Sequence, residues 1–296
     1  MQLRQALNEA VERLTSARVP SPRMNAELLI MFTLGCDRAY LYAHPERELS
    51  ADETQRYDEA LARRASGVPA QYLTGHQEFW GLDLIVSSAV LIPRPETEHV
   101  VEAVLKIASS ADSKLSQDQK PRTGVSAPHG LRIVDVGTGS GAIALALASE
   151  LPAAEIHATE ISPDALDIAR ANAARLELAS RIAFHRADLL GGFSPASFDV
   201  VVSNPPYVGE AEEDSVQLEV RKSEPRNAVF AGPTGLEVIE RLIPQAEVVL
   251  KPGGWLIFEI SGTIAACVRL LLANWTYVRL TNDLQGIARV ALAQRE

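Results

Sequence analysis

A short polar motif follows an apolar stretch in the second half of the chain. Residues 198–202 are typical of a buried strand, and Asn204-Pro205-Pro206-Tyr207 comes just after them. The Asn204 side-chain oxygen and the Pro205 carbonyl could each accept one N–H of a planar NH2 group. Two acceptors would orient that group and favour pyramidalisation of its nitrogen as positive charge develops. Pro206 adds rigidity, and Tyr207 could pack on the planar face of the bound group.

A glycine-rich loop lies upstream, between a predicted strand over 131–136 and a predicted helix over 141–150. Its sequence is Gly137-Thr138-Gly139-Ser140-Gly141, with glycine at alternate positions. Such glycines let the backbone turn sharply and approach a ligand closely. The spacing differs from the G-x-G-x-x-G of dinucleotide enzymes, which hold a pyrophosphate at a helix N-terminus. The loop suits an uncharged sugar and an amino-acid moiety instead.

Two acidic residues end the next two predicted strands. Glu160 could accept hydrogen bonds from both ribose hydroxyls of a nucleoside, and Asp188 could accept one from an adenine amino group. A glycine loop and two acids at three successive strand ends resemble a class I S-adenosylmethionine-dependent methyltransferase. The resemblance implies S-adenosylmethionine as the cofactor and S-adenosylhomocysteine as the product. It also implies that Leu189 and Asn204 border the cofactor.

With a sulfonium methyl as the electrophile, the polar motif predicts methylation of a planar NH2 group. Adenine N6, guanine N2 and the glutamine side-chain amide all qualify. The chain carries 28 basic and 38 acidic side chains, a net charge of −10, which argues against binding to nucleic-acid phosphates. A nucleic-acid amino methyltransferase remains the alternative. A cofactor-binding regulator without activity is disfavoured, since it would not need two converging acceptors.

Further motifs narrow the choice, and the whole chain resembles the HemK/PrmC family. They are Gln71-Tyr72-Leu73-Thr74-Gly75, Glu78-Phe79-Trp80-Gly81, Pro93-Arg94-Pro95-Glu96-Thr97-Glu98, Glu224-Pro225, Gly232-Pro233-Thr234-Gly235-Leu236 and Asp283-Leu284-Gln285-Gly286. The resemblance implies methylation of the N5 nitrogen of glutamine in the Gly-Gly-Gln tripeptide of bacterial class 1 peptide chain release factors. The −10 charge favours a partner with a basic contact surface.

The family pattern also implies residue roles. Residues 137–141 would line the cofactor, Glu160 would hold the ribose, and residues 204–207 would hold the glutamine. Some positions depart from the pattern: Glu160 stands where Asp is common, and Leu189 where some members carry Trp. Arg94 and Glu98 fit either ion pairs or the lip of the active site. The late sequence Glu259-Ile260-Ser261-Gly262 differs from the usual Glu-Ile-Gly, and we assign it no role.

The surrounding sequence predicts an α/β fold in two domains. Amphipathic segments in residues 1–70 predict a small helical domain, with Ser21 before Pro22 as an N-cap and a capping box at Ser50. With the family resemblance, we expect this domain to dock the substrate. Residues 71–93 read as a β-hairpin linker. Residues 94–296 alternate strands and helices, which predicts a seven-stranded, mostly parallel sheet with an antiparallel last strand. We expect a polar surface insertion over 109–130.

Composition bounds the remaining possibilities. The two cysteines, Cys36 and Cys267, lie far apart with no Cys/His cluster near them, so we expect neither a metal site nor a disulfide framework. No stretch approaches the roughly 20 apolar residues of a membrane span. The N-terminus reads as an amphipathic helix, not as a targeting segment. These features predict a cytoplasmic monomer that binds neither membranes nor nucleic acid stably.

Overall fold

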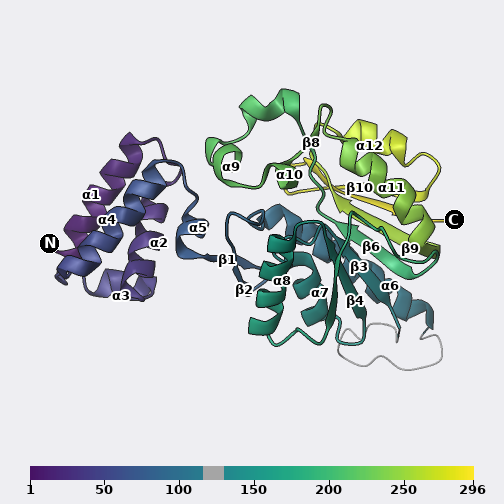
Figure 1. Ribbon diagram of the computed structural model, residues 1–296, viewed down its shortest axis with the longest axis horizontal. Coiled ribbons are helices and arrows are strands. Elements are labelled where there is room, and N and C mark those ends of the chain that lie inside the picture. Colours follow the sequence, from purple (N-terminus) through teal and green to yellow (C-terminus); the bar gives the residue numbers. More distant parts are fainter. Residues whose placement is uncertain (116–129) are drawn as a thin grey trace. The chain divides into compact units, whose positions relative to one another are not determined.

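The computed structural model describes residues 1–115 and 130–296, and its contacts divide the chain into two compact units (Figure 1). The helical unit comprises Met1–His76 and Val216–Glu224. The catalytic unit, named for the pocket described below, comprises Gln77–Ser215 and Pro225–Glu296. The predicted insertion over 109–130 lies mostly outside the described residues. At its start the prediction is wrong, because the helix that begins at Glu98 continues to Leu115.

The helical unit packs around a core of aliphatic side chains. Its helices are α1 (Leu3–Ser16), α2 (Pro22–Leu34), α3 (Arg38–Ala43), α4 (Ala51–Ala65), α5 (Ala70–Thr74) and the distant α9 (Leu218–Ser223). Leu3, Leu14 and Leu29 are fully buried at the centre. Within α1 the buried residues Leu3, Ala6, Ala10 and Leu14 recur at three- and four-residue steps, which explains why the sequence predicts a helix here.

Of the two helix caps predicted in the helical unit, one forms as expected and the other does not. At α4, Ser50 and Glu53 form the predicted capping box. At α2, Ser21 occupies the N-cap position with φ of +47° but makes no side-chain cap hydrogen bond. Instead, the Asn25 side-chain amide donates to the Ser21 carbonyl at 3.2 Å and to the Pro20 carbonyl at 2.8 Å. The N-cap prediction at Ser21 is therefore wrong in its chemistry.

A two-stranded hairpin opens the catalytic unit. Strands β1 (His76–Phe79) and β2 (Leu82–Ile85) form it, and residues 71–74 of the predicted linker belong to helix α5 instead. The buried Asn172 side chain anchors the hairpin, since its oxygen accepts from the Ile85 amide at 2.6 Å and its nitrogen donates to the Ile85 carbonyl at 3.0 Å. The same nitrogen donates to the Ser140 carbonyl at 2.9 Å, so the hairpin and the glycine loop share one anchor.

A seven-stranded sheet forms the centre of the catalytic unit, in the order β10-β11-β9-β6-β3-β4-β5. Five strands run parallel, and β11 pairs antiparallel with both β9 and β10. The strands are β3 (Arg132–Val136), β4 (Glu155–Glu160), β5 (Ile182–Arg186), β6 (Phe198–Ser203), β9 (Leu250–Glu259), β10 (Thr276–Asn282) and β11 (Ala288–Gln294). The predicted fold class is confirmed.

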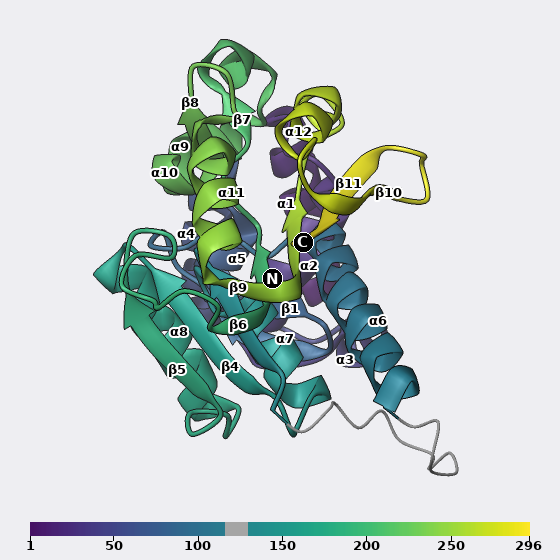
Figure 2. The same ribbon diagram turned by 90° about the vertical axis from the view of Figure 1, so that its right-hand side faces the viewer.

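Helices cover both faces of this sheet. On one face, η1 (Pro95–Thr97) leads into α6 (Glu98–Leu115), beside α7 (Ala142–Glu150) and α8 (Pro163–Arg175). On the other lie α11 (Glu237–Val249) and α12 (Ala265–Leu271), and Figure 2 shows α6 and α11 on opposite sides. Successive residues of β3 point to opposite faces of the sheet. Ile133 belongs to the apolar core on the side of α7, and Val134 belongs to the core on the side of α11. Burial on both faces explains the apolar runs in the central strand β6 and in the second half of β9.

The connection between β6 and α11 is the part of the fold that the sequence did not predict. It contains β7 (Val208–Gly209), η2 (Glu210–Ser215), α9, α10 (Arg226–Val229) and β8 (Phe230–Gly232), and β7 pairs parallel with β8. Each piece is too short for a hydrophobic period to be visible in the sequence.

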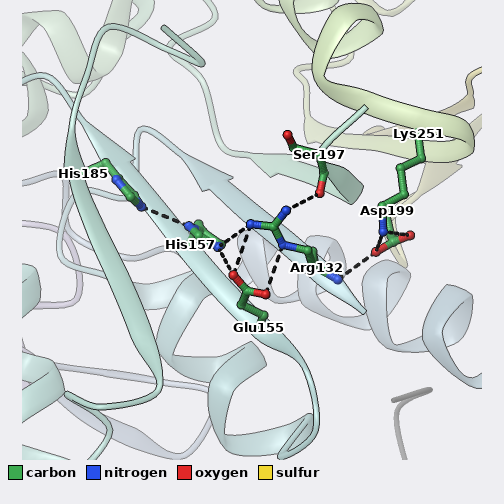
Figure 3. Close-up of polar contacts among 7 residues, drawn as sticks. All are labelled: Arg132, Glu155, His157, His185, Ser197, Asp199 and Lys251. Atoms are coloured by element: carbon green, nitrogen blue, oxygen red, sulfur yellow. Dashed lines mark hydrogen bonds and ion pairs between the residues drawn. The ribbon is translucent and has the colours of Figure 1, made fainter. Parts of the chain in front are cut away.

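A polar cluster joins five strands of the sheet (Figure 3). The Arg132 guanidinium of β3 donates to both oxygens of Glu155 on β4 at 3.1 Å, and Glu155 also contacts the His157 ring at 2.7 Å. His157 in turn contacts His185 of β5 at 3.0 Å. Asp199 of β6 accepts from the Arg132 backbone amide and from Lys251 of β9.

Within the described residues, no helix has both the length and the apolar content to cross a bilayer.

Candidate active site

A cavity of about 470 Å³ opens at the carboxyl ends of the parallel strands, within the catalytic unit. Most of the predicted site residues line it: Gly137, Thr138, Gly139, Ser140, Glu160, Asp188, Leu189, Asn204, Pro205 and Pro206. Gly141 and Tyr207 are not among the lining residues. Gly141 is the N-cap of α7, and Tyr207 turns its hydroxyl toward Glu259.

The glycine loop leaves β3 in a tight turn. The amides of Gly137 and Thr138 both donate to the Thr159 carbonyl at 2.9 Å, which holds the loop against the end of β4. Gly137 has φ of +70° and Gly139 φ of +56°, and a Cβ at either would meet no atom within 4 Å. Positive φ therefore selects glycine here, and both residues border open space where a ligand can approach the backbone.

Glu160 at the end of β4 joins two segments of the cavity wall. One carboxylate oxygen accepts from the Gly139 amide at 3.0 Å, and the other accepts from the amides of Ile161 at 2.9 Å and Ser162 at 3.0 Å. A carboxylate has about four acceptor positions, so three bonds leave about one for a ligand hydroxyl. If Glu160 accepts from both ribose hydroxyls, as predicted, then one hydroxyl must share an acceptor position on the carboxylate with a backbone amide.

Asp188, after β5, forms an ion pair with Arg241 of α11. Both side chains are 52% exposed, and both residues line the cavity. Leu189 follows with φ of +52°, which turns the chain sharply at the cavity edge. The sequence did not indicate Arg241, because it lies in a helix far from the motif residues.

Asp135 lies beneath the glycine loop and is 1% exposed. One of its oxygens accepts from the Thr138 hydroxyl at 2.6 Å and from the Ala144 amide at 3.2 Å. Among the described residues, none donates to the other oxygen, Oδ1. Burial raises the pKa of Asp135 to about 7, against the lowering effect of these hydrogen bonds.

Asn204 follows β6 at the wall of the cavity. Its Nδ2 donates to the Thr97 hydroxyl at 3.0 Å, and that hydroxyl donates to the Glu259 carboxylate at 2.6 Å. The Tyr207 hydroxyl donates to the other Glu259 oxygen at 2.9 Å. Burial raises the pKa of Tyr207, so its hydroxyl keeps its proton. This network places Tyr207 beneath the cavity wall.

The sequence did not indicate Thr97 or Glu259 as site residues. Thr97 lies inside the Pro-Arg-Pro-Glu-Thr-Glu segment, where Arg94 and Glu98 were the expected candidates. Glu98 accepts from the Trp80 backbone amide at 2.9 Å, which makes it part of the hairpin anchorage. Glu259 ends an apolar strand, as Glu160 does, and that shared position was the signal that could have identified it.

The cavity suits an S-adenosylmethionine-sized ligand. Open space beside two positive-φ glycines leaves room for the ligand at the backbone, and the carboxylates of Glu160 and Asp188 offer acceptors for hydroxyl and amino groups. Apolar lining by Ile143 and Leu189 suits a flat base.

Comparisons with known proteins cover both units. A family model described as the PrmC N-terminal domain matches residues 5–75, and one described as the methyltransferase small domain matches residues 123–223. A release factor glutamine methyltransferase of Koribacter versatilis is 51% identical over 100% of this chain and 99% of its own length. Another, of Moorella thermoacetica, is 44% identical with the same coverage. A solved methyltransferase from Pyrococcus furiosus, 18% identical, has a similar fold, with a TM-score of 0.50 over 82% of this chain and 98% of that one.

Proposed function

Since the chain belongs to the family of release factor glutamine methyltransferases, we propose that its cavity holds S-adenosylmethionine beside the glutamine of a release factor. The substrate would be the Gly-Gly-Gln glutamine of class 1 release factors, methylated on its side-chain nitrogen N5. The chief support is that the glycine loop, Glu160 and Asn204 line one cavity.

Two groups of residues would divide the work of binding. The loop over 137–140, Glu160, Asp188 and Leu189 would hold the cofactor. When bound, S-adenosylmethionine supplies a sulfonium methyl, which replaces one hydrogen of the glutamine NH2 group and leaves S-adenosylhomocysteine and a proton.

The glutamine side would rest on Asn204 and Pro205. Asn204 Oδ1 and the Pro205 carbonyl would each accept one N–H of the amide, which orients the nitrogen lone pair and stabilises the positive charge that develops on it. No general base is needed before transfer, because the methylated nitrogen is acidic enough to lose its proton. The chain contributes orientation and electrostatics to this reaction.

The helical unit would help to dock the release factor, and the −10 charge of the chain would favour a basic surface on that partner. Such an encounter would weaken as salt screens the charges. We place the reaction in the cytoplasm, with translation.

A methyl-transfer assay tests the proposal. The protein is incubated with S-adenosylmethionine and a purified class 1 release factor, and the peptide that contains Gly-Gly-Gln is analysed by mass spectrometry. We expect one added methyl on the glutamine. A release factor with alanine in place of that glutamine is the control and should gain none. An unmodified glutamine, or methyl incorporated into DNA or RNA instead, would overturn the proposal.

A further inference from the structure

Four side chains form a continuous hydrogen-bonded chain that starts at the wall of the cavity, where Asn204 and Thr97 lie, and ends behind it. Asn204 Nδ2 donates to Thr97 Oγ1, Thr97 Oγ1 donates to Glu259 Oε2, and Tyr207 donates to Glu259 Oε1. Thr97 is 3% exposed and Glu259 is 1% exposed, so water competes little for these groups. The residues come from η1, the end of β6 and the end of β9, which makes this a contact between three separate segments.

The chain of hydrogen bonds has a direction. An ionised carboxylate only accepts, and a threonine hydroxyl has a single hydrogen. Once Thr97 gives that hydrogen to Glu259, its oxygen can only accept from Asn204. The amide of Asn204 must then present its NH2 to Thr97 and its oxygen to the other side. Among the described residues, none donates to that Asn204 oxygen.

We propose that Thr97 and Glu259 are positioning residues that hold the Asn204 amide with its oxygen toward the NH2 group of the substrate. This inference rests on the proposed function. An amide rotated by half a turn would present its own NH2 to the substrate NH2, and two donors would face each other. Thr97 and Glu259 therefore set which end of Asn204 the substrate meets, and both act through Asn204.

The surroundings of Glu259 make the direction of these hydrogen bonds sensitive to low pH. Burial raises the pKa of Glu259, the hydrogen bonds from Thr97 and Tyr207 lower it, and Glu96 and Arg289 act on it in opposite directions. A protonated Glu259 could donate to Thr97 Oγ1. The Thr97 hydrogen would then pass to Asn204 and favour the rotated amide.

A matched pair of variants at Thr97 tests the inference. Thr97→Val keeps the shape and removes the hydroxyl, whereas Thr97→Ser keeps the hydroxyl. We expect Thr97→Val to lower kcat about tenfold to a hundredfold, the cost of losing one oriented hydrogen bond in the transition state. The KM for the release factor and the Kd for S-adenosylhomocysteine should stay within about twofold, since ground-state contacts are kept. Thr97→Ser should restore most of kcat. Thr281→Val, which removes a hydroxyl on β10, controls for the loss of a hydroxyl alone.

A double-mutant cycle separates positioning from general destabilisation. If Thr97 acts through Asn204, then Thr97→Val should cost no further activity in an Asn204→Ala background. If the Thr97→Val variant fails to fold, Glu259→Gln gives a second test. A neutral amide can face Thr97 with either end and does not titrate. The fall of kcat that we expect for wild type at low pH should therefore be absent in Glu259→Gln.

Equal kcat in Thr97→Val and wild type, or full additivity with Asn204→Ala, would overturn the inference. The failure of the proposed function looks different, because wild type itself would then leave the glutamine unmethylated. Thermal unfolding and S-adenosylhomocysteine titration of each variant show that the compared proteins are folded.

Discussion

Gly235 lies so close to Tyr207 that a Cβ on it would stand 2.6 Å from the Tyr207 carbonyl oxygen. The same Cβ would stand 3.0 Å from the Gly209 backbone nitrogen, and Gly235 has φ of +83°. Both neighbours are backbone atoms, which cannot swing aside as a side chain can. The segment before α11 thus fixes the path of the chain just after Asn204-Pro205-Pro206-Tyr207.

Gly235→Ala should therefore displace the motif loop. We expect a loss of stability above about 2 kcal/mol, since steric overlap adds to the cost of positive φ. Gly286→Ala is the matched control, because Gly286 has φ of +81° but no atom within 4 Å of a Cβ. It should cost only about 1 kcal/mol. Urea unfolding measures both, and an equal loss in the two variants would show that the close contact is unimportant.

Asn204→Ala should abolish methyl transfer while cofactor binding survives. In the proposed reaction the side chain would supply one of two acceptors for the substrate NH2, so we expect kcat to fall at least about a hundredfold. The Kd for S-adenosylhomocysteine, measured by calorimetry, should change less than about threefold. Asn282→Ala, at the exposed end of β10, provides the control. Equal losses of binding and transfer would contradict the assigned role.

Two substitutions of Glu160 should show whether its carboxylate charge or the length of its side chain matters more for cofactor binding. In Glu160→Gln, an NH2 group replaces an oxygen that accepts backbone N–H bonds, so donors would face donors at the glycine loop. We expect S-adenosylhomocysteine affinity to drop at least about tenfold. Glu160→Asp keeps both acceptors and should lose less. Calorimetry that finds Glu160→Gln equal to wild type would remove Glu160 from the cofactor site.

Asp135 should make the stability of the protein depend on pH. Its pKa in the folded protein is raised to about 7 from an ordinary value of 3.8, so between these pH values the folded state holds a proton that the unfolded state has lost. Stability from this group is present below about pH 4 and declines as pH rises toward 7. The isosteric Asp135→Asn should remove this decline, a difference of about 2–4 kcal/mol between pH 5 and pH 8. Parallel pH profiles of the two proteins in urea unfolding would refute it.

Arg64 should control the order of α9. Arg64 is 4% exposed, and its guanidinium donates to Asn25 Oδ1 at 2.7 Å and pairs with Glu219 of α9 at 2.6 Å. Arg64→Leu would leave Glu219 without this partner, so residues 216–224 should exchange backbone hydrogen faster. Helix α11 should be unchanged in the same hydrogen-exchange experiment. Unchanged exchange in 216–224 would mean that α9 is held by other contacts.

The sequence predicted those parts of the protein where one residue type implies one geometry. Positive φ at Gly137 and the strand-end position of Glu160 each follow from local chemistry. Full-length relatives confirm the family that the motifs indicated. Thr97 and Glu259 could not be paired in advance, because 162 positions separate them and only the fold brings their oxygens to 2.6 Å. The short elements between β6 and α11 escaped prediction because none shows a hydrophobic period.

The grouping of Val216–Glu224 with Met1–His76 affects how the protein can be recombined with its relatives. Residues 216–224 of the helical unit lie between the two parts of the sequence that form the catalytic unit. A chimera joined after His76 alone would combine a helical unit from one parent with an α9 from the other, and would mismatch the partner of Arg64. Functional exchange of the helical unit between relatives therefore requires two grafts, with the second inside the connection that follows Asn204-Pro205-Pro206-Tyr207.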